Sequence, residues 1–377
     1  MRVGIDVRAL QTASARRGVG TYIRGLLGGL ALARRDEEIL LFGAPGAVEV
    51  PPAFERVELS RPRRAITLWD QIAWPALLSR RGVTVFHSPF YAVPRLRPRS
   101  CAIVQTVHDL TPLRFPGAVT ARQARVFRFS FKMARSAHRI IVPSAATRDD
   151  VVSLLGVPAD RVAVIPLASG VGPDDVIAAD GEAPGALRRA GLGERSSFLL
   201  HTGGHDPIKN IPCLLDAFAV LRKQGRQLDL VIAGEEGPFT PGILAHAERA
   251  GVLDRVKLPG FVSRTDLIAL YRRAEALVYP SDAEGFGLPV LEAMACGTPV
   301  VASRAGALPE VAGSAGLLVP AGDAQGLAAA VASILDDPGR RDRMRSEGVA
   351  RAARFSWRET ARLTRDVYLE AHQEAAA

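Results

Sequence analysis

The sequence predicts an α/β protein made of two doubly wound domains, each a parallel sheet covered by helices. Short apolar or β-branched runs alternate with longer segments of helical period along the 377 residues, which is typical of βαβ units. This alternation fades over residues 166–185, a stretch rich in Gly, Pro, Ala and Asp, and then starts again. We therefore expect a linker or hinge between two domains. The length agrees, because single cores stop growing at roughly 250 to 300 residues.

The first domain is expected to span residues 1–175. Its expected strands lie at residues 2–7, 39–42, 83–86, 102–107, 139–142 and 161–165. Its expected helices lie at residues 20–33, 68–79, 121–137 and 147–155. Because strands and crossover helices alternate throughout, these elements make one complete doubly wound domain.

The second domain is expected to span residues 176–356 and to repeat the pattern. Its expected strands lie at residues 197–201, 228–233, 255–258, 276–279, 299–302 and 316–319. Its expected helices lie at residues 211–224, 242–250, 264–273, 289–295 and 324–335. The last segment, residues 357–377, contains a helix that we expect to pack back on the first domain. Two such domains place the site in the crevice between them, at the carboxyl ends of the strands.

The composition excludes several classes of protein. With 48% hydrophobic and 23% charged residues, the chain is neither collagen-like, disordered nor a disulfide scaffold. No run approaches the roughly 18 apolar residues that span a bilayer. The three cysteines, Cys101, Cys213 and Cys296, lack a metal-ligand spacing. We therefore expect a cytoplasmic protein without a disulfide or a metal site.

Charge is divided unequally between the two halves. Residues 1–175 hold 25 lysines and arginines against 14 acidic residues, whereas residues 176–377 hold 23 against 25. This asymmetry favours an anionic partner for the first domain, such as a lipid head group, a phosphorylated acceptor or nucleic acid. A solvated basic surface remains the alternative. Nucleic acid is not expected, because no basic stripe interleaved with aromatic residues accompanies the charge.

Part of the basic charge recurs at helical spacing within the first domain. The basic positions of this face are Arg122, Arg125, Arg128, Lys132, Arg135 and Arg139. Such a basic amphipathic helix suits an anionic surface, which here is the inner face of the cytoplasmic membrane, or a lipid-diphosphate acceptor. The alternative is a core helix with a solvated basic face.

The most informative segment is YPSDAEGFGLPVLEAMACGTPVVAS, residues 279–303. A strand is followed by a glycine-broken loop, and a helix opens at Pro289. Gly285 and Gly287 let the backbone approach a ligand closely. The free amides from about Leu288 onward, together with the helix dipole, favour a diphosphate at this position.

Two carboxylates bracket this loop, Glu284 before the glycines and Glu292 in the first helical turn. A carboxylate accepts two hydrogen bonds from vicinal hydroxyls. Glu292 therefore suits a ribose, and Glu284 suits a sugar beyond the phosphates. For Glu292 alone, an acid that stabilises the helix start remains the alternative.

The run E-G-F-G-L-P-V-L-E resembles the E-x7-E signature of retaining glycosyltransferase family 4. The resemblance covers nearly the whole chain and implies a GT-B fold: two Rossmann-like domains with a cleft between them, the second holding the donor. It implies that Glu292 binds the ribose, Glu284 the transferred sugar, and the amides of Phe286, Gly287 and Leu288 the sugar and phosphates. The donor is then a sugar nucleotide, GDP- or UDP-linked, and no metal or other cofactor is required.

A second segment, LLHTGGHDPIKNIPCLLDAF, resembles the family's G-G-x-D-x-R-K-N stretch. The donor-binding residues that it implies are Gly203, Gly204, Lys209 and Asn210. Lys209 would neutralise the departing nucleoside diphosphate, a role for a fixed cation because GT-B enzymes generally use no bound metal. Ile208 stands where a basic residue is usual in the family.

In the first domain, CAIVQTVHDLTPLRFP resembles the family's H-D-x-x-P-x-x-x-P stretch, which implies that His108 positions the sugar or acceptor. The early loop SARRGVGTYIRGLL is not a dinucleotide fingerprint, because Ile23 takes the place of its third glycine. It resembles instead a flexible glycine loop over the phosphates and acceptor. The residues expected at the acceptor and phosphates are Gly18 and Gly20 of this loop and Asp109 of the preceding stretch.

The resemblance therefore implies a retaining glycosyltransferase with His108, Glu284 and Lys209 as its catalytic residues. The leading reaction transfers mannose from GDP-mannose to a glycolipid, a lipid-linked oligosaccharide or a cell-surface polysaccharide. Two alternatives share the fold. One is a sugar-nucleotide epimerase or phosphorylase, and the other is a catalytically weak nucleotide-binding subunit, which Ile208 favours.

Overall fold

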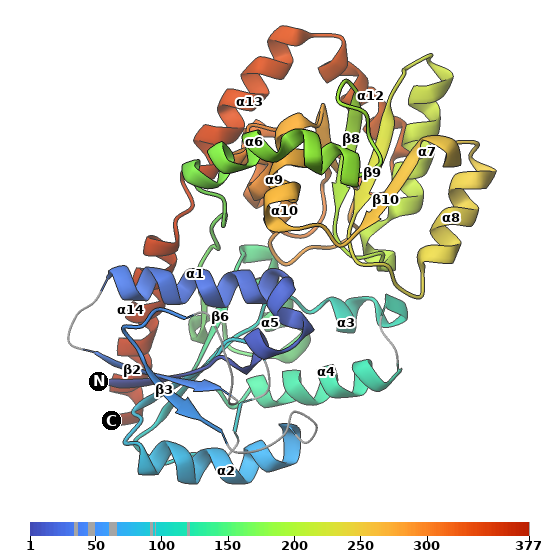
Figure 1. The fold of residues 1–377 in the computed structure, drawn as a ribbon. Helices are drawn as coiled ribbons and strands as arrows, with labels where there is room; N and C mark the ends of the chain where they lie inside the picture. The colour runs from blue at the N-terminus through green and yellow to red at the C-terminus, as the bar shows by residue number, and fades with distance from the viewer. Residues whose placement is uncertain are drawn as a thin grey trace. The chain divides into compact units, whose positions relative to one another are not determined.

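The computed structural model describes residues 1–33, 37–43, 50–59, 66–90, 93–94, 96–118 and 121–376. The chain divides into two compact units. Unit 1 comprises Met1–Ala168 and Phe355–Ala377, and unit 2 comprises Ser169–Arg354. Each unit is a parallel β-sheet with helices on its faces, which confirms the predicted α/β class (Figure 1).

Unit 1 is built on a sheet whose described strands all run parallel. In sheet order they are β3 (Glu55–Glu58), β2 (Glu38–Gly43), β1 (Arg2–Asp6), β4 (Val85–Ser88), β5 (Ala102–Thr106), β6 (Arg139–Val142) and β7 (Val162–Val164). Its helices are α1 (Gly18–Leu32), α2 (Ile66–Arg80), α3 (Thr111–Arg114), α4 (Ala121–Ala134), α5 (Ala145–Leu155) and α14 (Trp357–Ala376). One core cluster joins the sheet to α2, α4 and α5, and α2 lies below the sheet in Figure 1.

Helix α14 packs against α1 within unit 1. A Cβ atom on Gly25 would lie 2.1 Å from the Trp357 ring, and one on Gly29 would lie 2.2 Å from the Trp357 carbonyl oxygen. The absence of side chains at these two positions of α1 therefore makes the close contact possible. Farther along α14, the Tyr368 hydroxyl is hydrogen-bonded to Nδ1 of the buried His87 at 2.6 Å.

Unit 2 repeats the architecture with a second parallel sheet. In sheet order its strands are β10 (Val256–Gly260), β9 (Asp229–Ala233), β8 (Phe198–Thr202), β11 (Ala276–Tyr279), β12 (Val300–Ser303) and β13 (Leu317–Val319). Its helices are α6 (Pro173–Arg189), α7 (Ile211–Lys223), α8 (Thr240–Arg249), α9 (Arg264–Arg273), α10 (Leu288–Ala295), α11 (Leu308–Ala312), α12 (Ala324–Leu335) and α13 (Pro338–Ala352). The central strands β8, β9, β11 and β12 are buried throughout, as expected for a sheet covered on both faces.

The prediction of a linker over residues 166–185 is wrong for most of that segment, because helix α6 begins at Pro173. The Gly172 amide donates to the Asp175 carboxylate at 2.8 Å, which caps the helix. Gly181 and Pro184 suggested a break in the sequence, yet both lie inside the helix. The alanine-rich face of α6 packs against α9, and this tertiary contact overrides the weak local propensity.

The predicted basic face over residues 122–139 also needs correction. Helix α4 ends at Ala134, and Arg139 is the first residue of β6, where its guanidinium pairs with Glu374 of α14. The side chain of Arg122 lies outside the described residues. On the described helix the basic face therefore consists of three exposed residues, Arg125, Arg128 and Lys132.

No helix in the described part of the chain combines the length and the hydropathy that a bilayer-spanning segment requires.

Candidate functional site

Two residues from distant motifs meet in unit 2. The Nζ atom of Lys209 donates to Oε1 of Glu284 at 2.6 Å and to the Tyr279 hydroxyl at 2.9 Å. Lys209 lies in a short 3-10 turn after β8, and Glu284 lies in the loop after β11. Because β8 and β11 are neighbours in the sheet, their carboxyl-end loops are brought together.

Lys209 and Glu284 are mostly shielded from solvent, with side chains 19% and 14% exposed. Burial opposes the charged form of the lysine, but the Glu284 carboxylate and the Tyr279 hydroxyl more than offset it and raise the pKa of Lys209. The ammonium group therefore stays charged at neutral pH. It is a fixed cation, which is the type of group that binds phosphate oxygens.

The loop that carries Lys209 is tied to the loop that carries Glu284. The Asp282 amide donates to the Ile208 carbonyl oxygen, and the Asn210 side-chain amide donates to Oδ1 of Asp282, each at 2.8 Å. Asn210 also caps α7 in a left-handed conformation, with φ 47°. Its side chain, expected on the donor, is thus engaged within the protein. The Ile208 side chain is buried and packs inward at the position where the family places a cation.

Glycines set the close approach of the strand ends. A Cβ atom on Gly234 would lie 1.6 Å from the Gly203 carbonyl oxygen, and one on Gly203 would lie 3.3 Å from Cε of Lys209. Gly204 follows directly in the same loop, beside the Asp206 carboxylate. Gly203 therefore leaves the space beside the aliphatic part of the Lys209 side chain, and Gly234 allows the two loops to approach each other.

Helix α10 begins directly after Gly287, its N-cap, which has φ 99°. A Cβ atom there would also lie 2.6 Å from Cδ2 of Leu308, so a larger residue would be strained and crowded. Phe286 is buried beside it. The first helical amide, that of Leu288, points out of the helix end, where the dipole favours an anion.

Glu292 lies on α10, partly buried, and accepts a hydrogen bond from the Tyr271 hydroxyl at 3.3 Å. The Thr202 hydroxyl in turn lies 3.2 Å from the Tyr271 oxygen. Burial raises the pKa of Glu292 to about 7, against an ordinary value of 4.5. The carboxyl group therefore titrates in the neutral range.

Sequence reasoning missed two residues that support Glu284. Gly306, with φ 51°, lies so close that a Cβ atom would be 2.3 Å from the Glu284 carbonyl oxygen, which accepts from the Ala307 amide at 2.9 Å. Tyr279, which bonds Lys209, lay inside the quoted motif without a role. The sequence did contain a signal for Tyr279, because its hydroxyl is the one polar side-chain group of an otherwise apolar strand and stands at the strand's end. The sequence contained no such signal for Gly306, because its contact with Glu284 forms only in the folded chain.

His108 belongs to unit 1, in the loop after β5. Its Nε2 lies 2.9 Å from the Pro89 carbonyl oxygen, which only accepts, so Nε2 carries the hydrogen. The Tyr22 ring stands edge-on to the imidazole, with centroids 4.9 Å apart and planes at 78°. Burial lowers the pKa of His108, so the neutral ring presents an unprotonated Nδ1. Asp109 accepts a hydrogen bond from the amide of Thr111, the first residue of α3, at 3.0 Å.

The expected glycine loop over the phosphates is helical at both of its predicted glycines. Gly18 and Gly20 lie in the first turn of α1, after the short 3-10 segment Ala13–Arg16. A Cβ atom on Gly20 would lie 2.1 Å from the Ala15 carbonyl oxygen, so a tight turn requires this glycine. The helix therefore begins two residues earlier than expected, and Gly18 and Gly20 both lie in its first turn.

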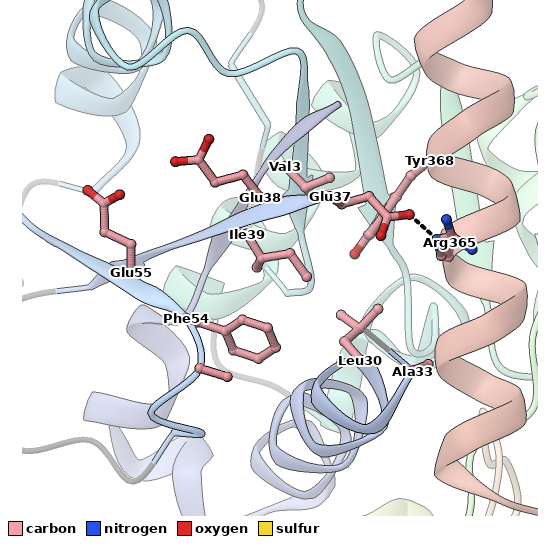
Figure 2. A pocket seen from close by; sticks show the side chains of 11 residues that line it. Val3, Leu30, Ala33, Glu37, Glu38, Ile39, Phe54, Glu55, Arg365 and Tyr368 are labelled. Atoms are coloured by element: carbon pink, nitrogen blue, oxygen red, sulfur yellow. Dashed lines mark hydrogen bonds and ion pairs between the residues drawn. The ribbon is translucent and has the colours of Figure 1, made fainter. Parts of the chain in front are cut away.

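A pocket of about 240 Å³ lies elsewhere in unit 1, at the amino ends of β1, β2 and β3 (Figure 2). Three glutamates line it, and each pairs with an arginine. The pairs are Glu37 with Arg365, Glu38 with Arg2 and Glu55 with Arg81. Because parallel-sheet enzymes bind ligands at the carboxyl ends of strands, this pocket is not the candidate site.

Comparison with known proteins agrees with this geometry. Residues 16–168 match the family model described as glycosyltransferase family 4, and residues 187–351 match the model described as glycosyl transferases group 1. The O-antigen chain mannosyltransferase B of Escherichia coli is 30% identical over 371 residues, covering 93% of this chain and 95% of that protein. A D-inositol 3-phosphate glycosyltransferase of Kineococcus radiotolerans is 36% identical over 267 residues, covering 65% of this chain and 60% of that protein.

Two solved structures show the similarity of fold. Sucrose-phosphate synthase of Thermosynechococcus elongatus has a TM-score of 0.74 at 23% identity, with 100% of both chains covered. Anabaena Alr3699/HepE, solved in complex with UDP and glucose, has a TM-score of 0.70 at 18% identity, with 97% of this chain and 98% of that chain covered.

Proposed function

Because the chain belongs to glycosyltransferase family 4 and has the GT-B fold, we propose that it transfers a hexose from a sugar nucleotide to an acceptor hydroxyl, with retention of anomeric configuration. The observation that carries the proposal is the meeting of Lys209 and Glu284 beside the amino end of α10. A diphosphate needs the cation and the helix end, and a sugar needs the carboxylate.

In this proposal each residue has one task. Lys209 and the amides of Gly287 and Leu288 hold the diphosphate and stabilise it as it leaves, without a metal ion. Glu284 accepts hydrogen bonds from the hydroxyls of the transferred sugar. Glu292 accepts from the ribose hydroxyls. His108, as a neutral imidazole, positions the sugar or the acceptor.

We propose GDP-mannose as the donor. The support is the mannosyltransferase of Escherichia coli, whose similarity to this chain extends over 95% of its length. The nucleobase has no such support from side chains. We therefore propose a panel of nucleotides as the first experiment.

The panel measures thermal unfolding with GDP, UDP, ADP and dTDP and with their common sugar conjugates. A ligand at 100 times its dissociation constant adds about 2.7 kcal/mol to the free energy of unfolding. We expect GDP and GDP-mannose to raise Tm, and Lys209→Met to abolish the shift. A selective shift with UDP would replace GDP-mannose as the donor. No shift with any nucleotide at millimolar concentration, in folded protein, would contradict the donor site.

We propose that the acceptor is a glycolipid, a lipid-linked oligosaccharide or a cell-surface polysaccharide, met at the inner face of the cytoplasmic membrane. Helix α4 supports this, because its exposed face carries Arg125, Arg128 and Lys132 together with Val126 and Phe129, which are 44% and 41% exposed. Basic residues beside exposed apolar side chains suit the surface of an anionic bilayer.

Vesicle flotation tests the membrane contact. We expect binding to phosphatidylglycerol-containing vesicles, weakened by salt, and little binding to pure phosphatidylcholine vesicles. Arg125→Gln with Arg128→Gln should reduce it, whereas Arg340→Gln with Arg343→Gln on α13 removes the same charge elsewhere and should not. Equal binding to both kinds of vesicle, or equal loss in both double variants, would contradict a role of α4.

A further inference from the structure

The Lys209–Glu284 ion pair occupies the groups that the proposed donor requires. Lys209 donates to Glu284 and to Tyr279, so two of its three ammonium hydrogens are already used without a ligand. The ion pair as a whole carries no net charge to attract a diphosphate. The Glu284 carboxylate also repels a diphosphate that approaches Lys209. The diphosphate and Glu284 therefore compete for the charge of Lys209.

The intact donor relieves this competition, but the free nucleoside diphosphate does not. Sugar hydroxyls donate hydrogen bonds and satisfy a carboxylate that gives up its lysine. A nucleoside diphosphate brings no such donors to Glu284. It leaves a shielded carboxylate with one partner fewer, which is costly in free energy.

We infer that Glu284 is an internal competitor of the diphosphate at Lys209, which makes the site favour the intact sugar nucleotide over the nucleoside diphosphate left after transfer. The inference rests on the proposed function. It assigns to this carboxylate a second task, which is to weaken the binding of the nucleoside diphosphate product. The same pair would then promote release of the nucleoside diphosphate and accept the next donor.

Hydrogen bonds hold the Lys209 loop and the Glu284 loop in place, so the ion pair does not break by movement of these loops apart. The Glu284 carbonyl oxygen is held by the Ala307 amide against Gly306, and the Lys209 loop is held by Asp282. Exchange of partners therefore takes place by rotation of side chains. This makes the competition a property of two side chains that substitution can separate.

Tyr279 is placed to serve both charges during this exchange. Its ring is 1% exposed and stacks on His201, with centroids 5.5 Å apart and planes at 22°. The His201 Nδ1 donates to the Val278 carbonyl oxygen at 3.0 Å, which fixes the imidazole beneath the phenol. The Tyr279 hydroxyl accepts from Lys209 and also has Glu284 as a hydrogen-bond partner. When Lys209 turns to a diphosphate, this hydroxyl remains for Glu284.

The experiment measures dissociation constants of GDP, UDP, GDP-mannose and UDP-glucose by calorimetry for the full chain and for Glu284→Gln. We expect Glu284→Gln to bind the nucleoside diphosphate roughly tenfold more tightly, because the competing charge is gone. The sugar nucleotide should gain much less, because the glutamine also weakens its sugar contacts. The preference for the intact donor then falls in the variant.

Asp282→Asn provides the matched control. It removes the same charge from the same loop, two residues away, and its Oδ1 still accepts from Asn210. If Asp282→Asn gains as much affinity for the nucleoside diphosphate as Glu284→Gln, the inference is overturned. Removal of any negative charge from this loop would then explain the gain. An unchanged or weaker affinity in folded Glu284→Gln would overturn it as well.

Tyr279→Phe tests the same idea with both charges kept. Without the hydroxyl, Glu284 loses its remaining partner when Lys209 turns away, so we expect weaker binding of the nucleoside diphosphate. Opposite effects of Glu284→Gln and Tyr279→Phe would support the competition, and an unchanged affinity in Tyr279→Phe would count against it. If wild type binds a nucleotide but the variants behave alike, the inference fails and the proposed function stands. If neither wild type nor Glu284→Gln binds any of the four ligands, both fail.

Discussion

The two units end their sheets in similar loops but hold those loops by different forces. In unit 2 the loops after β8, β11 and β12 are joined by an ion pair, by side-chain and backbone hydrogen bonds, and by glycines that allow contact. In unit 1 His108 is held by one carbonyl oxygen and by the ring of Tyr22. The comparison teaches that one architecture supports a charged, ion-paired end in one unit and a neutral, ring-packed end in the other.

The largest effect should follow from removing the cation of unit 2. We expect Lys209→Met to lower turnover of the sugar nucleotide roughly 1000-fold, because the leaving diphosphate loses its fixed countercharge in a shielded site. The measurement is release of nucleoside diphosphate, with nucleotide affinity determined in parallel. Lys257→Met, at a lysine in β10 that contacts only a backbone carbonyl oxygen among its described hydrogen bonds, is the control and should stay near wild type. A comparable loss of turnover in both variants would show that Lys209 has no specific role at the site.

The next effect separates the units. We expect His108→Ala to lower turnover about 100-fold, within the range of a positioned imidazole, while nucleotide affinity stays unchanged. The reason is that the proposed donor site lies entirely in unit 2. His246→Ala, at a histidine of unit 2 that pairs with Asp216, is the control. A His108 variant with weakened nucleotide binding would show that the division of tasks is wrong.

A smaller effect concerns the pH dependence of unit 2. Because burial raises the pKa of Glu292 to about 7, its carboxylate is mostly protonated at pH 6 and mostly ionised at pH 8. The ionised form accepts from the ribose, so sugar-nucleotide affinity should rise about tenfold over that interval and be flat in Glu292→Gln. The stability of the ligand-free protein should change with pH in the opposite direction. Its free energy of unfolding should fall between about pH 4.5 and 7, because the unfolded chain releases this proton first.

Calorimetry with a sugar nucleotide, which has no phosphate group titrating near neutrality, measures this dependence. A pH profile of wild type that is already flat would refute the ribose assignment. Unchanged affinity in folded Glu292→Ala would refute it independently of pH.

The smallest effect probes how unit 1 is held. Gly25→Ala places a methyl group where the Trp357 ring lies, so we expect a loss of about 1 to 3 kcal/mol in the free energy of unfolding. Gly28→Ala is the matched control in the same helix, because a Cβ atom there meets nothing within 4 Å. It should be neutral or stabilise α1. Thermal unfolding measures both, and equal effects would show that ring packing does not set the position of α1.

Sequence patterns predicted the elements with a clear apolar period and missed those without one. Strand β3 was not expected, because only Val57 of its four residues is buried at the sheet edge. Helix α13 was missed because nearly half of its residues are charged and its buried residues are few, Met344, Gly348 and Ala352. In each case the decisive contacts are tertiary, and no local pattern records them.

For the site, the residues were predictable but their arrangement was not. Lys209 and Glu284 were each assigned to the donor from the motifs, yet 74 residues of sequence separate them and only the order of β8 and β11 makes them neighbours. The packing requirement at Gly20 was also not readable from the sequence. A glycine required by the Ala15 carbonyl oxygen at a helix start looks the same in sequence as a glycine in a mobile loop.

The split composition of unit 1 has a consequence for how the chain is made. Its last segment, beginning at Phe355, leaves the ribosome only after all of unit 2 has been synthesised, at about 5 to 20 residues per second. Until then the surface of α1 at Gly25 and Gly29 lacks Trp357, and His87 lacks the hydroxyl of Tyr368. Unit 2 is continuous in sequence and can complete its fold while unit 1 still waits. Synthesis of unit 2 therefore leaves a period of roughly 10 to 40 seconds in which a chaperone can bind unit 1 before its final helix is available.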